Sequence, residues 1–267
     1  MARGVDDTLL AAASDEKGYL DLGQLFAQRY QIEALLGRGG MGAVYRVHDV
    51  KLDENVALKV LTLDSDEAAT RFVAEVRMAR RVTHPNVART HDFGEHDGWR
   101  FLTMELIDGA VLRDLVDEGG PLPAEQVARL GAAIADGLGA AHRAGIVHRD
   151  LKPSNVMVDR AGRVVITDFG IEQAARRNRD AHTTQTFMGT PHYMAPEQLT
   201  GDPVDQRADI YALGVMLYEL ATATLPFYGD DPIVVATSRL RGAAPDPRSV
   251  AAVPLPLAKL INHCMER

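Results

Sequence analysis

The chain of 267 residues is poor in several features that mark special classes of protein. It has one cysteine, Cys264, so no disulfide can form within the chain, and no Cys/His cluster has the spacing of a zinc site. Basic residues number 29 against 37 acidic ones, and the resulting net charge of −8 disfavours broad binding to nucleic acid. These scarcities predict a protein of a reducing compartment, the cytoplasm, that does not bind nucleic acid.

The sequence also lacks the run of roughly 20 apolar residues that a transmembrane helix needs. Its most apolar long stretch, residues 210–228, is interrupted by Glu219 and Pro226 and is better explained as a buried helix. The N-terminus differs from a secretory signal peptide, because Asp6 and Asp7 precede an apolar run that is too short. What is present, 46% hydrophobic and 25% charged residues, is typical of a globular protein with a substantial core.

The pattern of apolar residues changes along the chain. Residues 1–28 are small and polar, and we interpret them as a leader outside the main fold with a helix around residues 20–28. From Tyr30 the pattern predicts strands over residues 30–36, 43–48, 55–62, 101–106, 156–158 and 164–167. Helical spacing is found over residues 66–82, 124–144, 209–222 and 255–265. The sequence therefore predicts an α+β protein, with a small β-rich part followed by a larger helical part.

A glycine-rich stretch, residues 37–42, lies between the first two expected strands. Glycines at its first, third and sixth positions allow backbone N–H groups to approach phosphate oxygens, because no Cβ is in the way. A dinucleotide-binding fold would need a helix to begin at the last glycine, but a strand, residues 44–47, follows instead. Two interpretations stay open from these residues alone: a phosphate-binding loop, or a hairpin turn without a ligand.

Lys59 ends the apolar run Val56-Ala57-Leu58. A cation in that place points to the interior or into a cleft and needs an anionic partner, for which Glu75 in the next helix is the candidate. Taken alone, the same pattern is equally consistent with a surface lysine.

Two further loops bring together carboxylates, an amide and a lysine. The first reads His148-Arg149-Asp150-Leu151-Lys152-Pro153-Ser154-Asn155, and Asp168-Phe169-Gly170 begins 18 residues after Asp150. Hard oxygen ligands of this kind suit Mg²⁺ that is held together with substrate phosphates. Either piece could be a chance turn, but both in this order indicate a site for phosphate chemistry.

These motifs together resemble those of the eukaryotic-type protein kinases, most closely the bacterial Hanks-type Ser/Thr protein kinases. The resemblance extends from about residue 30 to the C-terminus. It implies a bilobal protein-kinase fold, in which a small β-rich lobe with one key helix and a larger helical lobe enclose an ATP cleft. The expected domain covers residues 29–267, with the small lobe and hinge at 29–109 and the large lobe at 110–267, and residues 1–28 are a flexible or regulatory leader.

The resemblance also implies roles for single residues. Asp150 accepts or orients the proton of the substrate hydroxyl, and Lys152 contacts the transferred phosphate. Lys59 contacts the α- and β-phosphates and pairs with Glu75. Asn155 and Asp168 hold Mg²⁺, with Mn²⁺ as an alternative. The implied ATP-binding residues are Leu36, Gly37, Arg38, Gly39, Gly40, Met41, Gly42, Ala43, Val44, Ala57, Lys59, Met104 (the gatekeeper), Glu105, Ile107 and Met157.

Within that set, the Glu105 carbonyl and the Ile107 amide would bond adenine, and Val44, Ala57 and Met157 would sandwich its ring. Downstream, Phe169 and Gly170, the Gly189-Thr190-Pro191 string and Ala195-Pro196-Glu197 resemble the two ends of an activation segment. Asp209 would open the buried helix that anchors the catalytic loop.

Threonines cluster midway along this segment, and Arg149 directly precedes Asp150. Family members with this arginine commonly neutralise it with a loop phosphate, and a phosphothreonine can order a loop through charge-assisted hydrogen bonds. We therefore expect autophosphorylation at Thr184 or Thr186, with Thr183 a weaker candidate; Thr190 is expected to brace Asp150 and Lys152 instead.

The sequence departs from the family pattern in two places. Glu172-Gln173 stand where bacterial relatives more often have a small residue and a base. The sequence also ends at Arg267, before the last helix whose arginine pairs in relatives with the position of Glu197, so we expect a fragment truncated before that helix.

The expected function is a Ser/Thr protein kinase that transfers the γ-phosphate of Mg-ATP to protein hydroxyls in signal transduction. A pseudokinase scaffold is disfavoured because Lys59, Asp150 and Asp168 are all present. A small-molecule phosphotransferase is disfavoured because residues 189–197 resemble a peptide-docking segment. Expected partners are a protein substrate and a transient homodimer for trans-autophosphorylation. A membrane anchor is expected only from a missing C-terminal part.

Overall fold

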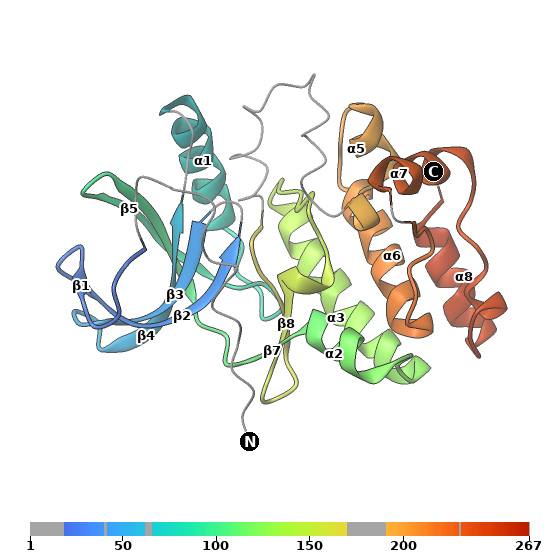
Figure 1. Cartoon of the computed structure of the whole chain (residues 1–267), viewed down its shortest axis with the longest axis horizontal. Helices are drawn as coiled ribbons and strands as arrows, with labels where there is room; N and C mark the ends of the chain where they lie inside the picture. The colour runs from blue at the N-terminus through green and yellow to red at the C-terminus, as the bar shows by residue number, and fades with distance from the viewer. Residues whose placement is uncertain (1–18, 40–41, 62–65, 170–190, 230, 267) are drawn as a thin grey trace.

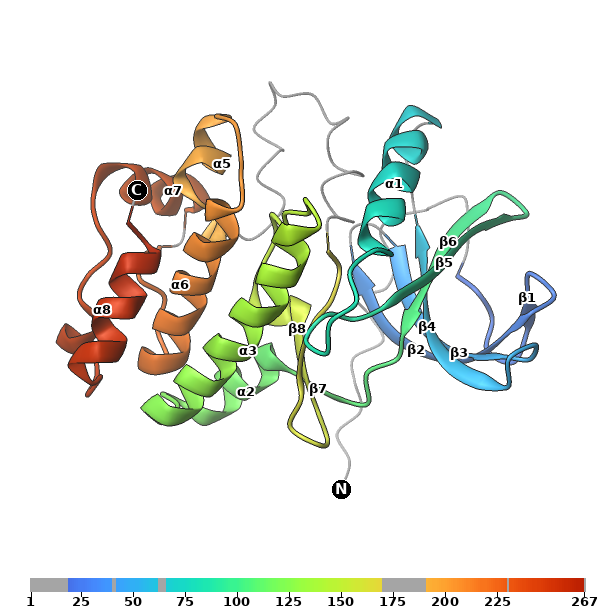
Figure 2. The same ribbon diagram turned by 180° about the vertical axis from the view of Figure 1, so that it is seen from behind.

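The computed structural model describes residues 19–39, 42–61, 66–169, 191–229 and 231–266. These residues form a β-rich lobe and a helical lobe, connected through a short segment after residue 105 (Figures 1 and 2). The predicted α+β architecture with two lobes is confirmed.

The small lobe is built on a six-stranded sheet in the order β1-β2-β3-β4-β6-β5, with every neighbouring pair antiparallel. One side of the sheet packs against helix α1, where Phe72 and Val76 belong with Leu102 and Met104 to one buried apolar cluster. Apolar side chains alternate along β3, as expected for a strand with one buried face. The strands are β1 (Leu25–Phe26), β2 (Tyr30–Gly39), β3 (Gly42–Asp49), β4 (Glu54–Leu61), β5 (Thr90–His96) and β6 (Trp99–Glu105), and α1 covers Asp66–Ala79.

The segment before Arg29 belongs to this lobe, which corrects the sequence prediction. Residues 19–29 contain no helix, and β1 pairs with the start of β2. Leu20 and Phe26 are buried in the core of the lobe, where the Phe26 ring packs edge-on against Phe101. The prediction failed because a two-residue strand has too few positions to show a period, while its stability comes from packing against residues far along the chain.

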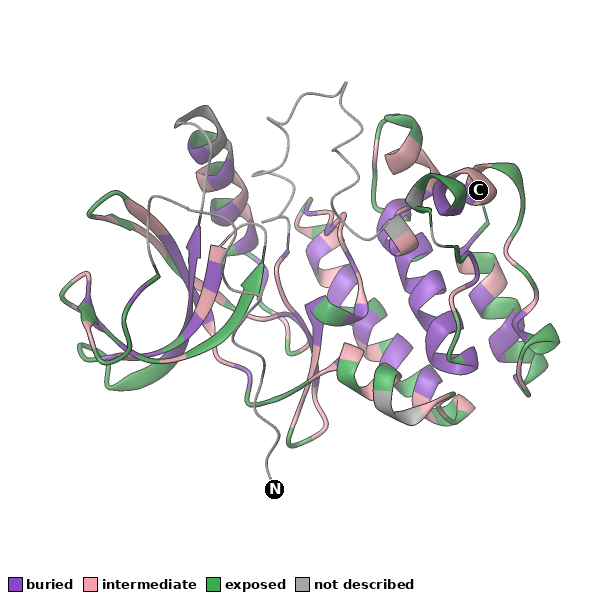
Figure 3. Cartoon of the chain, viewed as in Figure 1, coloured by how far each residue is buried: buried purple, intermediate pink, exposed green. Residues whose placement is uncertain are grey.

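The large lobe is helical. Helix α6 (Arg207–Thr222) lies between α3 (Ala124–Arg143) and α8 (Leu255–Cys264) and is buried along nearly its whole length (Figures 1 and 3). The apolar residues of α6 lie on all sides of the helix, which is the pattern of a central core helix. The other helices of the described residues are α2 (Leu112–Gly119), α5 (Pro196–Thr200) and α7 (Pro232–Arg241), with short 3-10 turns at Pro153–Asn155, Pro191–Tyr193 and Pro247–Ser249.

A small sheet lies where the lobes meet. Its order is β7-β8-β9, formed by β7 (Gly109–Val111), β8 (Val156–Asp159) and β9 (Val164–Ile166). The 3-10 turn at residues 153–155 leads into β8, and β9 leads to Asp168, so this sheet positions the loops that carry Asp150 and Asp168 at the interlobe junction. Across the described part of the chain, no helix is long and apolar enough to cross a membrane.

Candidate active site

A cavity of about 660 Å³ opens between the lobes. It is lined by nine of the residues expected to bind nucleotide or metal: Leu36, Gly37, Val44, Ala57, Met104, Glu105, Ile107, Met157 and Asp168. Its other walls are Arg46, Leu106, Asp108, Gly109, Val111, Ser154 and Thr167. Val44 and Ala57 come from the small lobe and Met157 from β8 of the large one, as a sandwich around a flat ring requires. Arg38, Gly39, Gly42, Ala43 and Lys59 do not line it, and Gly40 and Met41 lie outside the described residues.

The glycines of the loop above this cavity have different reasons to be glycine. Gly42 has φ +131°, and a Cβ there would lie 1.9 Å from the Val60 carbonyl oxygen, so β3 can pair with β4 only with glycine at this position. At Gly37 and Gly39 a Cβ would meet nothing within 4 Å. No contact within the described chain therefore requires glycine at those two positions. This is expected of a loop whose backbone approaches a ligand, because the space beside each glycine is then left for the ligand.

The segment between the lobes is held by an ion-pair network. Arg163 donates to Glu105 Oε1 at 2.7 Å and to Asp159 Oδ2 at 3.0 Å. Hydrogen bonds to Glu105 raise the pKa of Arg163 despite its partial burial, and the guanidinium stays charged. The Glu105 side chain is therefore paired with Arg163 of the large lobe, and residues 105–107 form part of the cavity wall. Sequence reasoning missed this contact because it joins residues 58 positions apart.

Polar residues of the loop at residues 150–155 form a compact cluster beside the cavity. The Lys152 ammonium lies 2.7 Å from Asp150 Oδ2. The Asn155 amide nitrogen donates to the Asp150 carbonyl oxygen at 2.8 Å and to its Oδ2 at 3.3 Å. These two donors fix the direction of the Asp150 carboxylate. The two hydrogen bonds from Asn155 also keep its amide nitrogen turned toward Asp150, so that the amide oxygen of Asn155 is the atom left to act as a ligand.

Asp209, at the start of α6, holds the backbone of this loop. Its carboxylate is buried and accepts from the His148 amide at 2.8 Å and the Arg149 amide at 2.7 Å, and it lies 2.7 Å from His142 Nε2. Arg149 has φ +66°, a left-handed conformation that costs a non-glycine residue about 1–2 kcal/mol. The hydrogen bonds from the His148 and Arg149 amides to Asp209 stabilise that turn directly before Asp150.

Lys59 pairs with Asp168 in this structure. It is 6% exposed and donates to Asp168 Oδ1 at 2.8 Å, and its expected pair with Glu75 stays a prediction. Asp168 itself has φ +59°. Sequence reasoning missed the contact with Asp168 because this residue lies on a loop 109 positions away, which no local pattern reveals.

The two ends of the expected activation segment are described and its middle is not. Phe169 is buried and its ring packs on His148, with the centroids 4.7 Å apart. Glu197 is half-buried, and within the described part of the chain no hydrogen bond or ion pair to its carboxylate is found. A link that sequence reasoning missed lies next to it: the Gln198 amide donates to the Arg149 carbonyl oxygen at 2.7 Å. Gly170, Glu172, Gln173, Thr183, Thr184, Thr186 and Thr190 lie outside the described residues.

The donor set of the site fits a metal that is shared with a ligand. Among the described residues no group of three or more His, Cys, Asp and Glu side chains could hold a metal by itself. Asp168 lines the cavity, and Asn155 adjoins it because its carbonyl oxygen accepts from the amide of the lining residue Thr167 at 2.9 Å. Together the two side chains offer one carboxylate and one amide oxygen. Mg²⁺ in nucleotide enzymes is typically held by one or two such groups together with phosphates and water. The residues present therefore fit a Mg²⁺ that would be held together with nucleotide phosphates.

With this geometry established, comparison with known proteins decides the family. The family model described as "Protein kinase domain" matches residues 30–266. The chain belongs to the protein kinase family. This kinase domain is 36% identical over 227 residues to the serine/threonine-protein kinase PrkC of Bacillus subtilis, covering 84% of the chain and 35% of that protein. It is 42% identical over 237 residues to pkn3 of Myxococcus xanthus, covering 85% of the chain and 43% of that protein.

A third relative, PknB of Mycobacterium leprae, is 38% identical over 222 residues, which cover 80% of this kinase domain and 36% of the relative. The chain thus spans between a third and a half of the length of these relatives. Among solved structures, a crystal structure titled as Rad53 1-466 in complex with AMP-PNP superposes with a TM-score of 0.75 at 23% identity, over 89% of this chain and 60% of that one. That likeness supports the protein-kinase fold.

Proposed function

We propose that the chain is an active Ser/Thr protein kinase that transfers the γ-phosphoryl group of ATP to a protein hydroxyl. The observation that carries the proposal is the cluster of Asp150, Lys152 and Asn155, which lies next in the chain to Ser154, a lining residue of the cavity of about 660 Å³ that Asp168 lines. The names of the serine/threonine kinase relatives support the same chemistry. Kinase catalysis depends mainly on positioning and charge stabilisation, and these residues supply both.

In the proposed reaction, the substrate hydroxyl lies against Asp150 and attacks the γ-phosphorus. The bond from that phosphorus to the oxygen of the leaving ADP breaks as the new P–O bond forms, and the hydroxyl proton goes to Asp150. Lys152, 2.7 Å from Asp150, is placed to offset negative charge on the phosphoryl group in transfer. Asn155 and Asp168 would hold Mg²⁺, or Mn²⁺, which when bound neutralises phosphate charge.

Lys59 has a second proposed state. The structure pairs it with Asp168, whereas the family resemblance pairs it with Glu75. We infer that nucleotide and metal occupy Asp168 and leave Lys59 to contact the α- and β-phosphates and Glu75. Glu75→Gln should then lower turnover more than nucleotide affinity. A Glu75→Gln enzyme with unchanged turnover would contradict the inferred pair.

The proposal also covers the regulation of the kinase and its cellular location. We propose autophosphorylation at Thr184 or Thr186, with Thr183 weaker, in a transient homodimer. A cytoplasmic location fits the ATP requirement and the single free cysteine. Peptide mass spectrometry after incubation with ATP would test the phosphosites, and a fully active enzyme without phosphate on residues 183–186 would contradict them.

The activity itself is tested with labelled ATP and a generic basic protein. We expect label on serine or threonine of the acceptor. Tight nucleotide binding without transfer to any protein would instead indicate a pseudokinase.

A further inference from the structure

The turn between β8 and β9 holds the segment that connects the two lobes. Arg163, the last residue of this turn, donates to Glu105 Oε1 at 2.7 Å and to Asp159 Oδ2 at 3.0 Å. A third hydrogen bond joins its Nη1 to the carbonyl oxygen of Pro85 at 3.3 Å. One guanidinium therefore connects three parts of the chain: the interlobe segment, the end of β8, and the stretch between α1 and β5.

The turn that carries Arg163 is itself tightly hydrogen-bonded. Asp159 Oδ1 accepts from the amides of Ala161 and Arg163, at 2.9 and 2.8 Å. Hydrogen bonds from the Arg163 amide and side chain hold the pKa of Asp159 below its ordinary value, so this carboxylate stays charged. Gly162, with φ +83°, allows the chain to reverse here. Because the turn is already ordered, Arg163 loses little freedom when it pairs with Glu105.

The Glu105 carboxylate bridges two segments beside the nucleotide cavity. Its Oε1 accepts from Arg163, and its Oε2 accepts from the Arg89 amide at 3.2 Å. The side chains of Arg163 and Glu105 are 35% and 28% exposed, so their ion pair is better shielded from water than a surface pair. Residues 105–107 line the cavity and Arg163 does not. Arg163 therefore acts on the cavity through Glu105.

We propose that Arg163 is a positioning residue for the nucleotide base and sets the preference for adenine over guanine. The proposal rests on the proposed kinase function, in which the Glu105 carbonyl and the Ile107 amide bond the base. Adenine offers its amino group to an acceptor and its N1 to a donor, whereas guanine offers an O6 acceptor and an N1–H donor in the opposite order. A backbone fixed by Arg163 leaves mismatched groups unpaired, and a backbone that can shift avoids that penalty.

The same turn offers a matched control. Arg160 pairs with Asp108, another residue that lines the cavity, at 3.2 Å. Their side chains are 82% and 69% exposed, and an ion pair so exposed contributes little. The Arg160 amide also donates to the Asp108 carbonyl oxygen at 3.2 Å, a bond that does not depend on the side chain. Arg160→Met should therefore keep nucleotide affinity within about twofold of the wild type.

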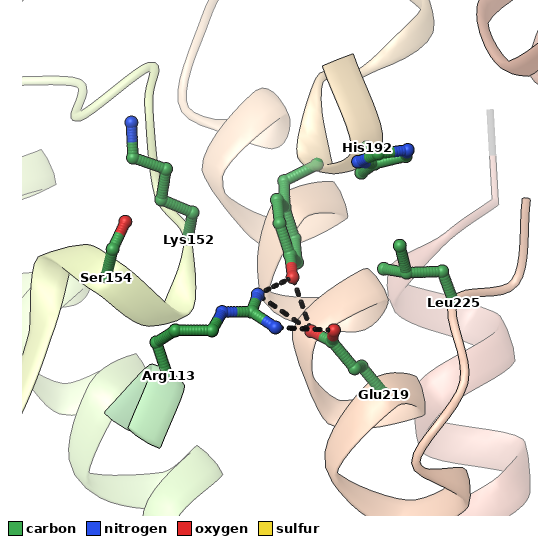
Figure 4. A pocket seen from close by; sticks show the side chains of 7 residues that line it. Arg113, Lys152, Ser154, His192, Glu219 and Leu225 are labelled. Carbon is green, nitrogen blue, oxygen red and sulfur yellow. Dashed lines mark hydrogen bonds and ion pairs between the residues drawn. The ribbon is translucent and has the colours of Figure 1, made fainter. Parts of the chain in front are cut away.

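A second control separates positioning from stability. Arg113 of α2 and Glu219 of α6 face each other at 3.0 Å in a separate cavity of about 210 Å³ on the large lobe (Figure 4). The Tyr193 hydroxyl hydrogen-bonds to both side chains. These three residues do not line the nucleotide cavity. Arg113→Met should therefore lower Tm, as the loss of a partly buried ion pair does, and leave nucleotide affinity unchanged.

The test is calorimetric titration of the full chain with ADP and with GDP, each in the presence of Mg²⁺. The wild type should bind ADP more tightly than GDP. Arg163→Met should weaken ADP binding by about tenfold, which corresponds to a segment in its binding position about a tenth of the time, and should change GDP binding far less. Arg163→Lys keeps a cation that can reach one of the two carboxylates, so its ADP affinity should lie between those of Arg163→Met and the wild type.

A double-mutant cycle shows whether Arg163 acts through Glu105. Glu105→Met removes the carboxylate, and in the double variant the second substitution should then add little to the loss of ADP affinity. Additive losses would place the action of Arg163 elsewhere and overturn the inference.

The outcomes distinguish this inference from the proposed function. A wild type that binds ADP but transfers phosphate to no protein overturns the kinase function alone, and one that binds no ADP overturns both. A wild type without a preference for ADP, or an Arg163→Met variant that keeps the wild-type preference, overturns the inference alone. So does an equal loss of ADP affinity in Arg163→Met and Arg113→Met, because the effect would then be one of stability. If Arg163→Met does not fold, Arg163→Lys decides, and an unchanged preference in that variant overturns the inference.

Discussion

Replacing Asp209 by asparagine should loosen the catalytic loop, although the change is nearly isosteric. The carboxylate, 0% exposed, meets three nitrogens at 2.7–2.8 Å. An amide offers one acceptor oxygen and two donor hydrogens, so either the His148 or the Arg149 amide must face another donor. Hydrogen bonds to charged groups contribute roughly 1.5–3 kcal/mol, and a buried group left unsatisfied adds its desolvation cost, which gives a loss of about 3 kcal/mol.

Thermal and urea denaturation measure this loss. A change of that size lowers Tm by roughly 6–12 °C in a protein of about 200 residues or more. Phosphate transfer should fall as well, because the left-handed turn at Arg149 precedes Asp150 directly. The control is Asp136→Asn, an exposed carboxylate on α3, which should stay within about 0.5 kcal/mol of the wild type. Equal stability of the two variants would refute the role assigned to Asp209.

Three further predictions follow from other parts of the structure. Removing residues 1–28 should destabilise the small lobe, since it deletes the buried Leu20 and Phe26 together with β1; a truncated protein with unchanged Tm in calorimetry would contradict this. Burial alone would raise the pKa of Asp49, but hydrogen bonds from Arg29 and the Lys51 amide hold it below its ordinary value. The contribution of the Asp49 charge to the free energy of unfolding should therefore be complete above about pH 4 and be lost as pH falls further through the folded pKa. In urea unfolding, the difference in free energy between wild type and Asp49→Asn should be constant from about pH 7 to 5 and shrink only below that range. Excess chelator should abolish phosphate transfer, and added Mg²⁺ should restore it; transfer that persists at an unchanged rate would exclude the metal role of Asn155 and Asp168.

The sequence predicted those parts of the site whose residues are close together along the chain. Asp150, Lys152 and Asn155 fall within six positions, and their clustering needs only one loop. Helix α6 was equally predictable, because its continuous apolar character leaves a core helix as the natural interpretation. The bounds of α1, α3, α6 and α8 agreed with expectation to within three residues at each end, whereas the helix expected around residues 20–28 is absent.

The contacts that were missed depend on packing between distant segments. The contact between Lys59 and Asp168 was missed because the position of a loop relative to a distant strand is a property of the assembled lobes. The network of Arg113, Tyr193 and Glu219 joins three segments that share no local pattern. In the same way β1 is defined by its partner strand and by the pocket that receives Phe26, and not by its own two residues.

Single-turnover phosphate transfer by Asp150→Asn, measured beside nucleotide affinity, tests the central claim most directly. If Asp150 orients the hydroxyl and takes its proton, the rate should fall by about 10²–10⁴-fold, the usual contribution of a positioned acid–base group. Nucleotide affinity should change little, since Asp150 is not among the residues that line the nucleotide cavity. A variant whose transfer rate stays within a few-fold of the wild type would contradict the assignment of this site as the centre of protein phosphorylation.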